Sequence, residues 1–495
     1  MIRAAALLAA LQPASPLAVL STAPWAVLPF ARPTAVFTEV APVLLTIPAS
    51  LAGGAGCPPL PAPTSLAVYM STGYVGLCVA NASALPVAPG APPLGFDLAS
   101  CSVPFSGESW RSWPPAAVPA HSEWLRNYDG VMAAVPTGGS LLLVRHGEHK
   151  NELCWGNDLL YQGTINADVD ARNCFSGYHN TSGFSDCQAA YNALTTGALL
   201  PFSAATCYGL GEPGNASAVD LGPLAWPVDG YLNASGGKAG YGVRQPSAVA
   251  AWDGAVMLGW IDNGFDTADI WFARAPPPPA PLGAASFFSF NHASRAWDLP
   301  TLPAGFAARN FAAFLRSPSP AGAPGSGGAP AFPLAPDAGS VHVAAARLTV
   351  GGAPTNLHLI VYDVVNYTQC YDGSAATQPA GEGAGTRTVR GVLAARRRAR
   401  AAPGGGACVP PWRLFLRTTA DFVDFSAPVE LADYAAPGWG AARLAYPTLV
   451  SADGARNDEV DAGGFYVVGT CAQDDAACGS TDGPQVTAAR VVIAV

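Results

Sequence analysis

The sequence predicts an all-β protein built from repeated antiparallel strand pairs, the pattern of a β-propeller. Gly and Pro are abundant, with 54 and 47 of 495 residues, which favours many turns and short strands over long helices. Strand–turn–strand units recur about every hundred residues, each with a Gly-rich turn about ten residues on. These units begin near Asp129, Gln245, Ser340 and Tyr446. A six-bladed propeller or a β-sandwich made of the same strands is the alternative architecture.

Composition limits the classes of partner. Half of the residues are apolar and 12% are charged, so the chain can bury a sizeable core. The net charge of -9 argues against nucleic-acid binding, which requires a basic surface.

Residues 1–20 are predicted to be a secretory signal peptide. Arg3 precedes an apolar run over 4–11, and the small residues Ala14 and Ser15 follow. An ordinary buried segment is the alternative. Apolar character returns over 17–30, so an uncleaved anchor is a second alternative, but four prolines disfavour a membrane-spanning helix there. These are Pro13, Pro16, Pro24 and Pro29.

Two further features predict secretion to the extracellular space. Five N-x-S/T glycosylation sequons are present, at Asn81, Asn180, Asn215, Asn233 and Asn366. The eleven cysteines lack the paired spacing of a zinc site, so we expect disulfides. Cys471 and Cys478 bracket a short acidic loop and are the predicted local pair.

The strands are predicted in chain order. Extended structure is expected over 35–50, and 65–80 is predicted to form a hairpin. The segment 127–148 has the pattern of a strand, a Gly-rich turn and a second strand that ends in a cluster of ionisable residues. The segment 241–274 predicts three strands, with a hairpin turn at Asp253-Gly254.

The last units follow the same pattern. Two strands about a Gly-rich turn are predicted over 339–365, and two hairpins over 412–470. The chain ends in a predicted strand, VTAARVVIAV. In a propeller, N-terminal strands could pair with this last strand, close the ring and remove an exposed sheet edge.

Residues 35–495 are therefore predicted to form one propeller domain with inserted loops. The segment 371–407 contains a basic cluster flanked by Ala and Gly, and is predicted to be a disordered insertion. A polyanion-binding arm is the alternative interpretation. The segment 151–186 is polar and aromatic, as functional loops often are.

Several segments resemble the five-bladed propeller glycosidases of the arabinanase, xylosidase and invertase type. LFLRTTADFVDFSAPVEL resembles an outer hairpin of that family, and WFARA at 271–275 resembles the same strand in an earlier blade. RQPSAVAAWDGAVMLGWIDNG and YPTLVSADG resemble its inner strands, which commonly begin with Pro-Ser or Pro-Thr. The likeness spans about residues 120–495. It implies a secreted glycoside hydrolase with five blades.

In that family three carboxylates on successive inner strands surround the sugar, and paired acid/base chemistry needs one ionised and one protonated carboxyl group. Asp129 occupies the position of the first and is the predicted base; a turn Asp before Gly130 is the alternative. The second blade has Gln245 before Pro246 where the family has Asp, and Asp262 is the predicted substitute or, alternatively, a loop cap.

The predicted proton donor is Glu148. No Glu occurs between Ala284 and Val365, so the usual acid of the third blade has no match, and Asp337 or His342 lies nearest to its location. A polar rim would equally explain the cluster that contains Glu148.

Carbohydrate is the predicted partner, with no cofactor and no protein metal site, although a structural ion at the propeller axis would fit the fold. The substrate-binding candidates are Arg126, Arg145, His146, Trp260, His342 and Tyr446. Sialidases are a second comparison, but their repeated Ser-x-Asp-x-Gly-x-Thr-Trp turn is absent. A carbohydrate-binding propeller without catalysis is the alternative function.

Overall fold

A computed structural model defines the fold. It describes the following parts of the chain: residues 17–22, 26–28, 43–46, 64–71, 74–81, 102–105, 125–137, 140–149, 192–201, 219–228, 230, 240–264, 268–277, 282–306, 331, 338–339, 342–366, 412–433, 444–452, 457–471 and 485–495. Across these residues the regular structure is strand, apart from one short 3-10 helix, η7 (Ala284–Ser286). The predicted all-β class is confirmed.

The first two groups of strands are antiparallel sheets. One has the order β3-β4-β5-β6, with strands β3 (Val43–Thr46), β4 (Thr64–Ser71), β5 (Tyr74–Asn81) and β6 (Ser102–Phe105). The next contains β7 (Leu125–Thr137), β8 (Ser140–His149), β9 (Asn192–Pro201) and β10 (Val219–Pro223).

The third group continues the same hydrogen-bonded sheet. It contains β11 (Gly240–Ala250), β12 (Val256–Gly264), β13 (Ala268–Ala275), β14 (Phe288–Asn291) and β15 (Ala296–Pro300). A single parallel pairing, Gly242 with Ala193, joins β11 to β9, so the nine-stranded sheet consists of two antiparallel groups joined at one point.

The last two groups lie toward the C-terminus. One has the order β20-β19-β18-β17, with β17 (Val343–Val350), β18 (Ala353–Asn366), β19 (Trp412–Thr419) and β20 (Val429–Asp433), and β16 (Ala338–Gly339) pairs with β18. The other contains β21 (Leu444–Ser451), β23 (Phe465–Cys471), β24 (Gln485–Ala494), β1 (Ala18–Thr22) and β2 (Ala26–Leu28). Between them, β22 (Glu459–Asp461) pairs in parallel with β17.

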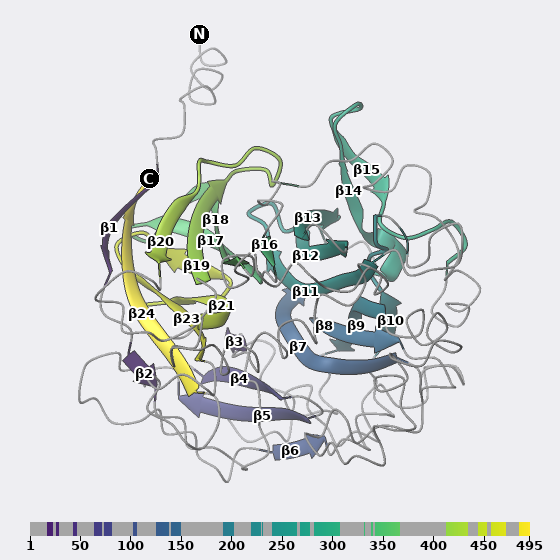
Figure 1. Ribbon diagram of the computed structural model, residues 1–495, viewed down its shortest axis with the longest axis horizontal. Coiled ribbons are helices and arrows are strands. Elements are labelled where there is room, and N and C mark those ends of the chain that lie inside the picture. The colour runs from purple at the N-terminus through teal and green to yellow at the C-terminus, as the bar shows by residue number, and fades with distance from the viewer. Residues whose placement is uncertain are drawn as a thin grey trace, which may run out of the picture.

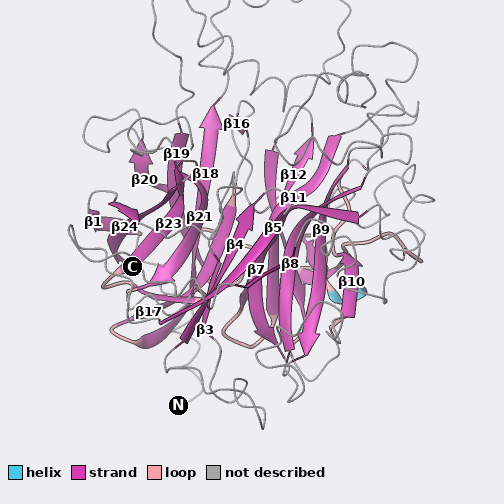
Figure 2. Cartoon of the chain, turned by 90° about the horizontal axis from the view of Figure 1, so that it is seen from below, coloured by secondary structure: helices cyan, strands magenta, loops and turns pink. Residues whose placement is uncertain are grey.

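These five groups surround a common centre (Figure 1). The first strands of successive groups contact one another, β7 with β11, β11 with β17, and β17 with β21. Figure 2 shows the sheets side-on, standing next to one another. A ring of antiparallel sheets that meet through their first strands is a β-propeller.

The ring is closed by strands from both ends of the described chain. β1 pairs with β24 from Ala18–Ala494 to Thr22–Val491, and β2 pairs with the beginning of β24. Leu17, just before β1, is 6% exposed and packs into the core of this sheet. The predicted closure is confirmed. The signal boundary predicted at residue 20 falls within β1, while residues 1–16 lie outside the described part of the chain.

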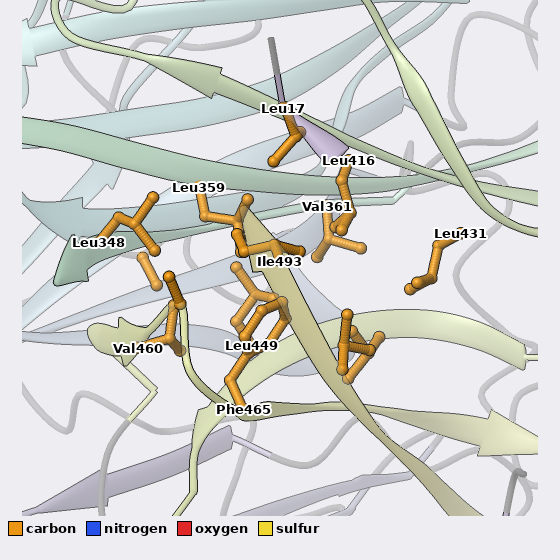
Figure 3. Close-up of a cluster of buried hydrophobic side chains, with 14 of the residues drawn as sticks. Leu17, Leu348, Leu359, Val361, Leu416, Leu431, Leu449, Val460, Phe465 and Ile493 are labelled. Atoms are coloured by element: carbon orange, nitrogen blue, oxygen red, sulfur yellow. The ribbon is translucent and has the colours of Figure 1, made fainter. Parts of the chain in front are cut away.

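Hydrophobic clusters fill the interfaces between neighbouring groups. The cluster in Figure 3 packs the sheet of β17–β20 against that of β21–β24, with Leu359, Leu416, Leu449 and Phe465 at its centre. Two similar clusters join β17 and β18 to β11–β13, and β7 and β8 to β11–β13. Each fully buried aliphatic or aromatic side chain contributes about 1.5–3 kcal/mol. The packed interfaces therefore fix the relative positions of the first strands.

The segment TTADFVDFSAP forms the turn between the two outermost strands of its sheet, β19 and β20. Thr419 Oγ1 accepts the backbone N–H of Phe422 at 2.8 Å, and Asp421 Oδ1 accepts those of residues 423 and 424 at 2.9 Å. The turn places Phe422 and Phe425 on Phe272 of β13, with ring centroids 5.1 and 5.8 Å apart. This motif thus has a structural role, joining one group of strands to the next.

Candidate active site

The N-terminal ends of the first strands share one face of the propeller. β7, β8 and β9 pair antiparallel in turn, and β11 pairs parallel with β9, so β7 and β11 run in the same direction. Trp252, just after β11, donates its indole N–H to the carbonyl of Leu357, whose neighbour His358 pairs with Arg347 in the second half of β17, so β11 and β17 also run in the same direction. We call the end at which these strands begin the axial face.

Three of the first strands, β7, β11 and β21, carry a register break. In β7 the register is interrupted between Asn127 and Gly130, across Tyr128 and Asp129. In β11 the interruption spans Gln245 and Pro246, and in β21 it spans Tyr446 and Pro447.

β17 has its break further along, between Arg347 and Thr349, and His342 directly precedes this strand, whose pairing starts at Val343–Tyr362. Register breaks of this kind redirect side chains and are common beside active sites. Of the residues predicted from the sequence, Asp129 and Tyr446 therefore lie in register breaks of their strands, and His342 lies directly ahead of its strand.

The neighbouring strand β8 brings the RHGE residues to the same end. Arg126 pairs with Glu148, Gly130 with His146, and Val131 with Arg145. The predicted base and the predicted proton donor thus belong to adjacent strands of one hairpin.

Gln245 has an unusual backbone. Its φ is +52°, in the left-handed region that non-glycine residues rarely adopt, and its side chain is buried. The surrounding sheet holds this conformation, which costs about 1–3 kcal/mol. Strain of this kind clusters at functional sites, although here the residue is an amide that cannot act as an ionised group.

Asp262 lies near the end of β12, paired with Val243 and with Asp269. It is 8% exposed, and its Oδ2 accepts the backbone N–H of Val228 at 2.5 Å. This contact ties the segment after β10 to β12. A loop-anchoring role, the alternative left open by the sequence, therefore has a direct structural basis.

His342 and Asp363 form a buried pair. His342 Nδ1 lies 3.1 Å from Asp363 Oδ2, and the backbone N–H of His342 donates to Asp363 Oδ1 at 2.5 Å. In return, the backbone N–H of Asp363 donates to the His342 carbonyl at 3.2 Å. The side chains are 6% and 0% exposed. The Nδ1 contact orients the imidazole, and the two contacts of the His342 backbone hold the beginning of β17 beside β18.

Asp363 was not anticipated from the sequence. Its signal is a lone carboxylate inside the apolar run LHLIVYDVV of β18, since a buried Asp requires partners that satisfy it. Trp260, in contrast, was predicted to bind substrate, but it is fully buried in the core between β7–β8 and β11–β13, where its indole packs against other side chains.

Other predicted features lie at the edge of the described chain or beyond it. Asn81 and Asn366 are the last residues of β5 and β18, and Cys471 is the last residue of β23. Residues 371–407, Cys478 and three sequons lie outside the described residues; the sequons are those of Asn180, Asn215 and Asn233.

Two features are absent from the described residues. No three His, Cys, Asp or Glu side chains gather closely enough to hold a metal ion. Nor does any helix in that part of the chain have the length and hydropathy needed to cross a membrane.

No family model matches the chain, and no curated protein does. Solved structures similar to it include the catalytic domain of a Coprinopsis cinerea GH62 α-L-arabinofuranosidase, with 7% identity and a TM-score of 0.39 over 95% of this chain and 97% of that one. The Podospora anserina α-L-arabinofuranosidase PaAbf62A has 9% identity and a TM-score of 0.38 over 96% of this chain and 98% of that one. A Trypanosoma rangeli sialidase has 9% identity and a TM-score of 0.34 over 92% of this chain and 55% of that one.

These neighbours are glycoside-cleaving enzymes, the class that the sequence resemblance implies. Identities below 10% and TM-scores below 0.5 transfer neither a substrate nor a mechanism, which have to come from the residues of this chain.

Proposed function

We propose that this protein is a secreted glycoside hydrolase that works by acid/base chemistry at the axial face. The observation that carries the proposal is the recurrence of a register break at the axial end of the first strands. The breaks in β7 and β21 and the start of β17 carry Asp129, Tyr446 and His342. Polar groups gathered around a propeller axis would suit a sugar, which needs many directional hydrogen bonds.

Asp129 is the proposed base or nucleophile. It lies in the break of β7, on the same hairpin as Glu148, Arg145 and His146. Hydrolysis also needs a proton donor for the leaving oxygen. The candidates for this donor are Glu148 on β8, the residue predicted from the sequence, and His342 ahead of β17. Arg145 and His146 are proposed to bind sugar hydroxyls.

Secretion belongs to the proposal as well. The proposed signal peptide ends ahead of Leu17, because Leu17 and β1 are part of the closed ring. Asn81 and Asn366 are proposed glycan attachment sites, and Cys471 a disulfide partner of Cys478.

Purified protein would be screened on 4-nitrophenyl α-L-arabinofuranoside, 4-nitrophenyl β-D-xyloside, sucrose and 4-methylumbelliferyl sialoside. Asp129→Asn should lower kcat/KM on any active substrate by about 100- to 10,000-fold. Asp298→Asn is the matched control, since Asp298 is exposed on the outermost strand β15.

Full activity in Asp129→Asn would remove Asp129 from the mechanism. A wild-type protein that binds these sugars and hydrolyses none of them would instead be a carbohydrate-binding propeller.

A further inference from the structure

We propose that the sheets of β11–β13 and β17–β20 are held together by an acid-sensitive clamp, which opens when His358 becomes protonated. The clamp consists of Trp252, Phe422 and His358. It lies beyond the C-terminal end of β11, on the side of the ring opposite the axial face, so it is separate from the candidate active site. The inference is therefore independent of the proposed glycosidase function.

The clamp joins the two sheets in both directions. Trp252, in the turn after β11, donates its indole N–H to the carbonyl of Leu357 in β18 at 2.8 Å. In return, the turn between β19 and β20 places Phe422 on Phe272 of β13, with ring centroids 5.1 Å apart. The ring of His358 is a neighbour of both contacts, 6.5 Å from Trp252 and 4.6 Å from Phe422. A charge on His358 therefore acts on the two halves of the clamp at once.

His358 suits this place as a neutral ring. It is 2% exposed, and neither of its ring nitrogens has a hydrogen-bond partner among the described residues. A neutral imidazole packs here as an aromatic ring, whereas an imidazolium has two N–H donors and a buried charge to satisfy. Burial accordingly lowers the pKa of His358 to about 4, although the backbone of Thr419 favours the charged form.

A positive charge already lies beside this ring. Arg347 of β17 pairs directly with His358 across the sheet, and its guanidinium carbon lies 5.1 Å from the ring centre of Trp252. Asp458 and Glu459 hold the guanidinium at 2.9 and 3.1 Å. Arg347 therefore moves away from a protonated His358 only by breaking two ion pairs, and its charge adds to the cost of protonation.

The carboxylates around the clamp compensate this charge poorly. Asp253, in the turn after β11, favours the charged ring, but its carboxylate is bound to Arg274. The turn between β19 and β20 carries Asp421 and Asp424, which are both exposed, and Oδ1 of Asp421 accepts backbone N–H groups of its own turn. Water is therefore the partner that stabilises a protonated His358.

The Trp252 half of the clamp is the half that admits water. Trp252 is half-buried, whereas Phe422 is 3% exposed and Phe272 is 4% exposed. Release of Trp252 breaks one hydrogen bond and uncovers the ring of His358, which then regains a pKa near 6.5. Because the open form binds the proton more tightly, the clamp weakens as pH falls from 6.5 toward 4. The equilibrium constant for opening should rise about 20-fold from pH 7 to pH 5.

Hydrogen exchange of the Trp252 indole N–H measures this opening, because the bond that this group makes is the one that breaks. Protein labelled with nitrogen-15 tryptophan gives an NMR signal for each indole, and Trp252→Phe identifies the signal of Trp252. In heavy water, its protection relative to free indole at the same pH should fall about 20-fold from pH 7 to pH 5. His358→Phe keeps an aromatic ring without the charge and should remove this pH dependence.

The indole N–H of Trp260 is the internal control. Trp260 is fully buried in the cluster between β7–β8 and β11–β13, and Trp260→Phe identifies its signal. Its N–H should exchange more slowly than that of Trp252 at both pH values, since it is released by unfolding of the whole protein rather than by the clamp.

Protection of Trp252 that is the same at pH 7 and pH 5 overturns the proposal, as does a fall that persists in His358→Phe. Equal protection of Trp252 and Trp260 at each pH also overturns it, because the clamp would then open only when the whole protein unfolds. His358→Gln, which likewise removes the charge, carries the test if His358→Phe does not fold.

Discussion

His358 should make the stability of the propeller depend on pH between 6.5 and about 4. The residue lies in β18, is 2% exposed, and packs its ring 4.6 Å from that of Phe422 and 6.5 Å from that of Trp252. Burial lowers the pKa of His358 from 6.5 to about 4; the backbone of Thr419 opposes the shift, Arg347 adds to it, and Asp253 opposes it. The folded protein therefore holds His358 neutral at pH values where the unfolded chain protonates it.

The sign and size of this pH dependence follow from the linkage between proton binding and unfolding. The unfolded state binds more protons between pH 6.5 and about 4, so stability falls as pH falls through this window. The free energy of unfolding should drop by about 2 kcal/mol from pH 7 to pH 5, and by about 3 kcal/mol at pH 4. Asp253 and Asp461 have lowered pKa values, so their contributions are lost only below the usual carboxylate range.

Guanidinium unfolding of wild type and His358→Gln at pH 7 and pH 5, at one ionic strength, measures this effect. Comparing the pH dependence rather than the absolute stability cancels any packing loss in the variant. The wild type should lose about 2 kcal/mol more than the variant between the two pH values. Equal losses would show that His358 protonates as easily in the folded protein as in the unfolded chain, and the account of its burial would be wrong.

Three further predictions concern the fold. Gly259→Ala should lower the free energy of unfolding by about 1–3 kcal/mol, because the added Cβ would lie 2.7 Å from the ring of Phe272, which is already packed between blades. In the control Gly283→Ala the nearest atom to the added Cβ is Ser286 Oγ at 3.8 Å, so the unfolding midpoint should change little. Asp461→Asn should lower the free energy of unfolding by about 1–3 kcal/mol in chemical denaturation. Asp461 accepts hydrogen bonds from Thr349 Oγ1 and from the backbone N–H groups of residues 352 and 463. No loss is expected if the amide satisfies the same donors. Mass spectrometry of protein secreted by a host cell should place the N-terminus ahead of Leu17, since β1 closes the ring; a first residue beyond Thr22 would contradict the observed closure.

The hairpins could be predicted from the sequence because their turns are marked. Asp253-Gly254 and Gly351-Gly352 place residues with positive φ where the turns require them, at +83° for Gly254 and +59° and +78° for the Gly pair. The strands beside them alternate or run apolar, as in 343–350.

Other strands carry no such signal. β9, NALTTGALLP, is rich in Ala, Leu, Gly and Thr, and it is a strand because it pairs along its whole length with β8. β14 and β15 are short and are likewise defined by their partner strands.

The residues of the candidate site also differ in whether the sequence could predict them. The first-strand residues Asp129, His342 and Tyr446 could be found because each opens a repeated unit. Asp363 comes from the second strand and contacts His342, a residue 21 positions away, and no local pattern encodes this contact. Trp260 shows the converse problem: β12 is covered on both faces, so its sequence lacks the alternation that would separate a buried Trp from an exposed one.

The most direct test of the central claim is the position of a bound sugar. A crystal structure of Asp129→Asn with an intact cleavable glycoside should place the scissile bond at the axial face, between residue 129 on β7 and His342 at the start of β17. A sugar bound at the opposite ends of the first strands, or on the outer strands β10, β15 or β20, would contradict the proposed active site.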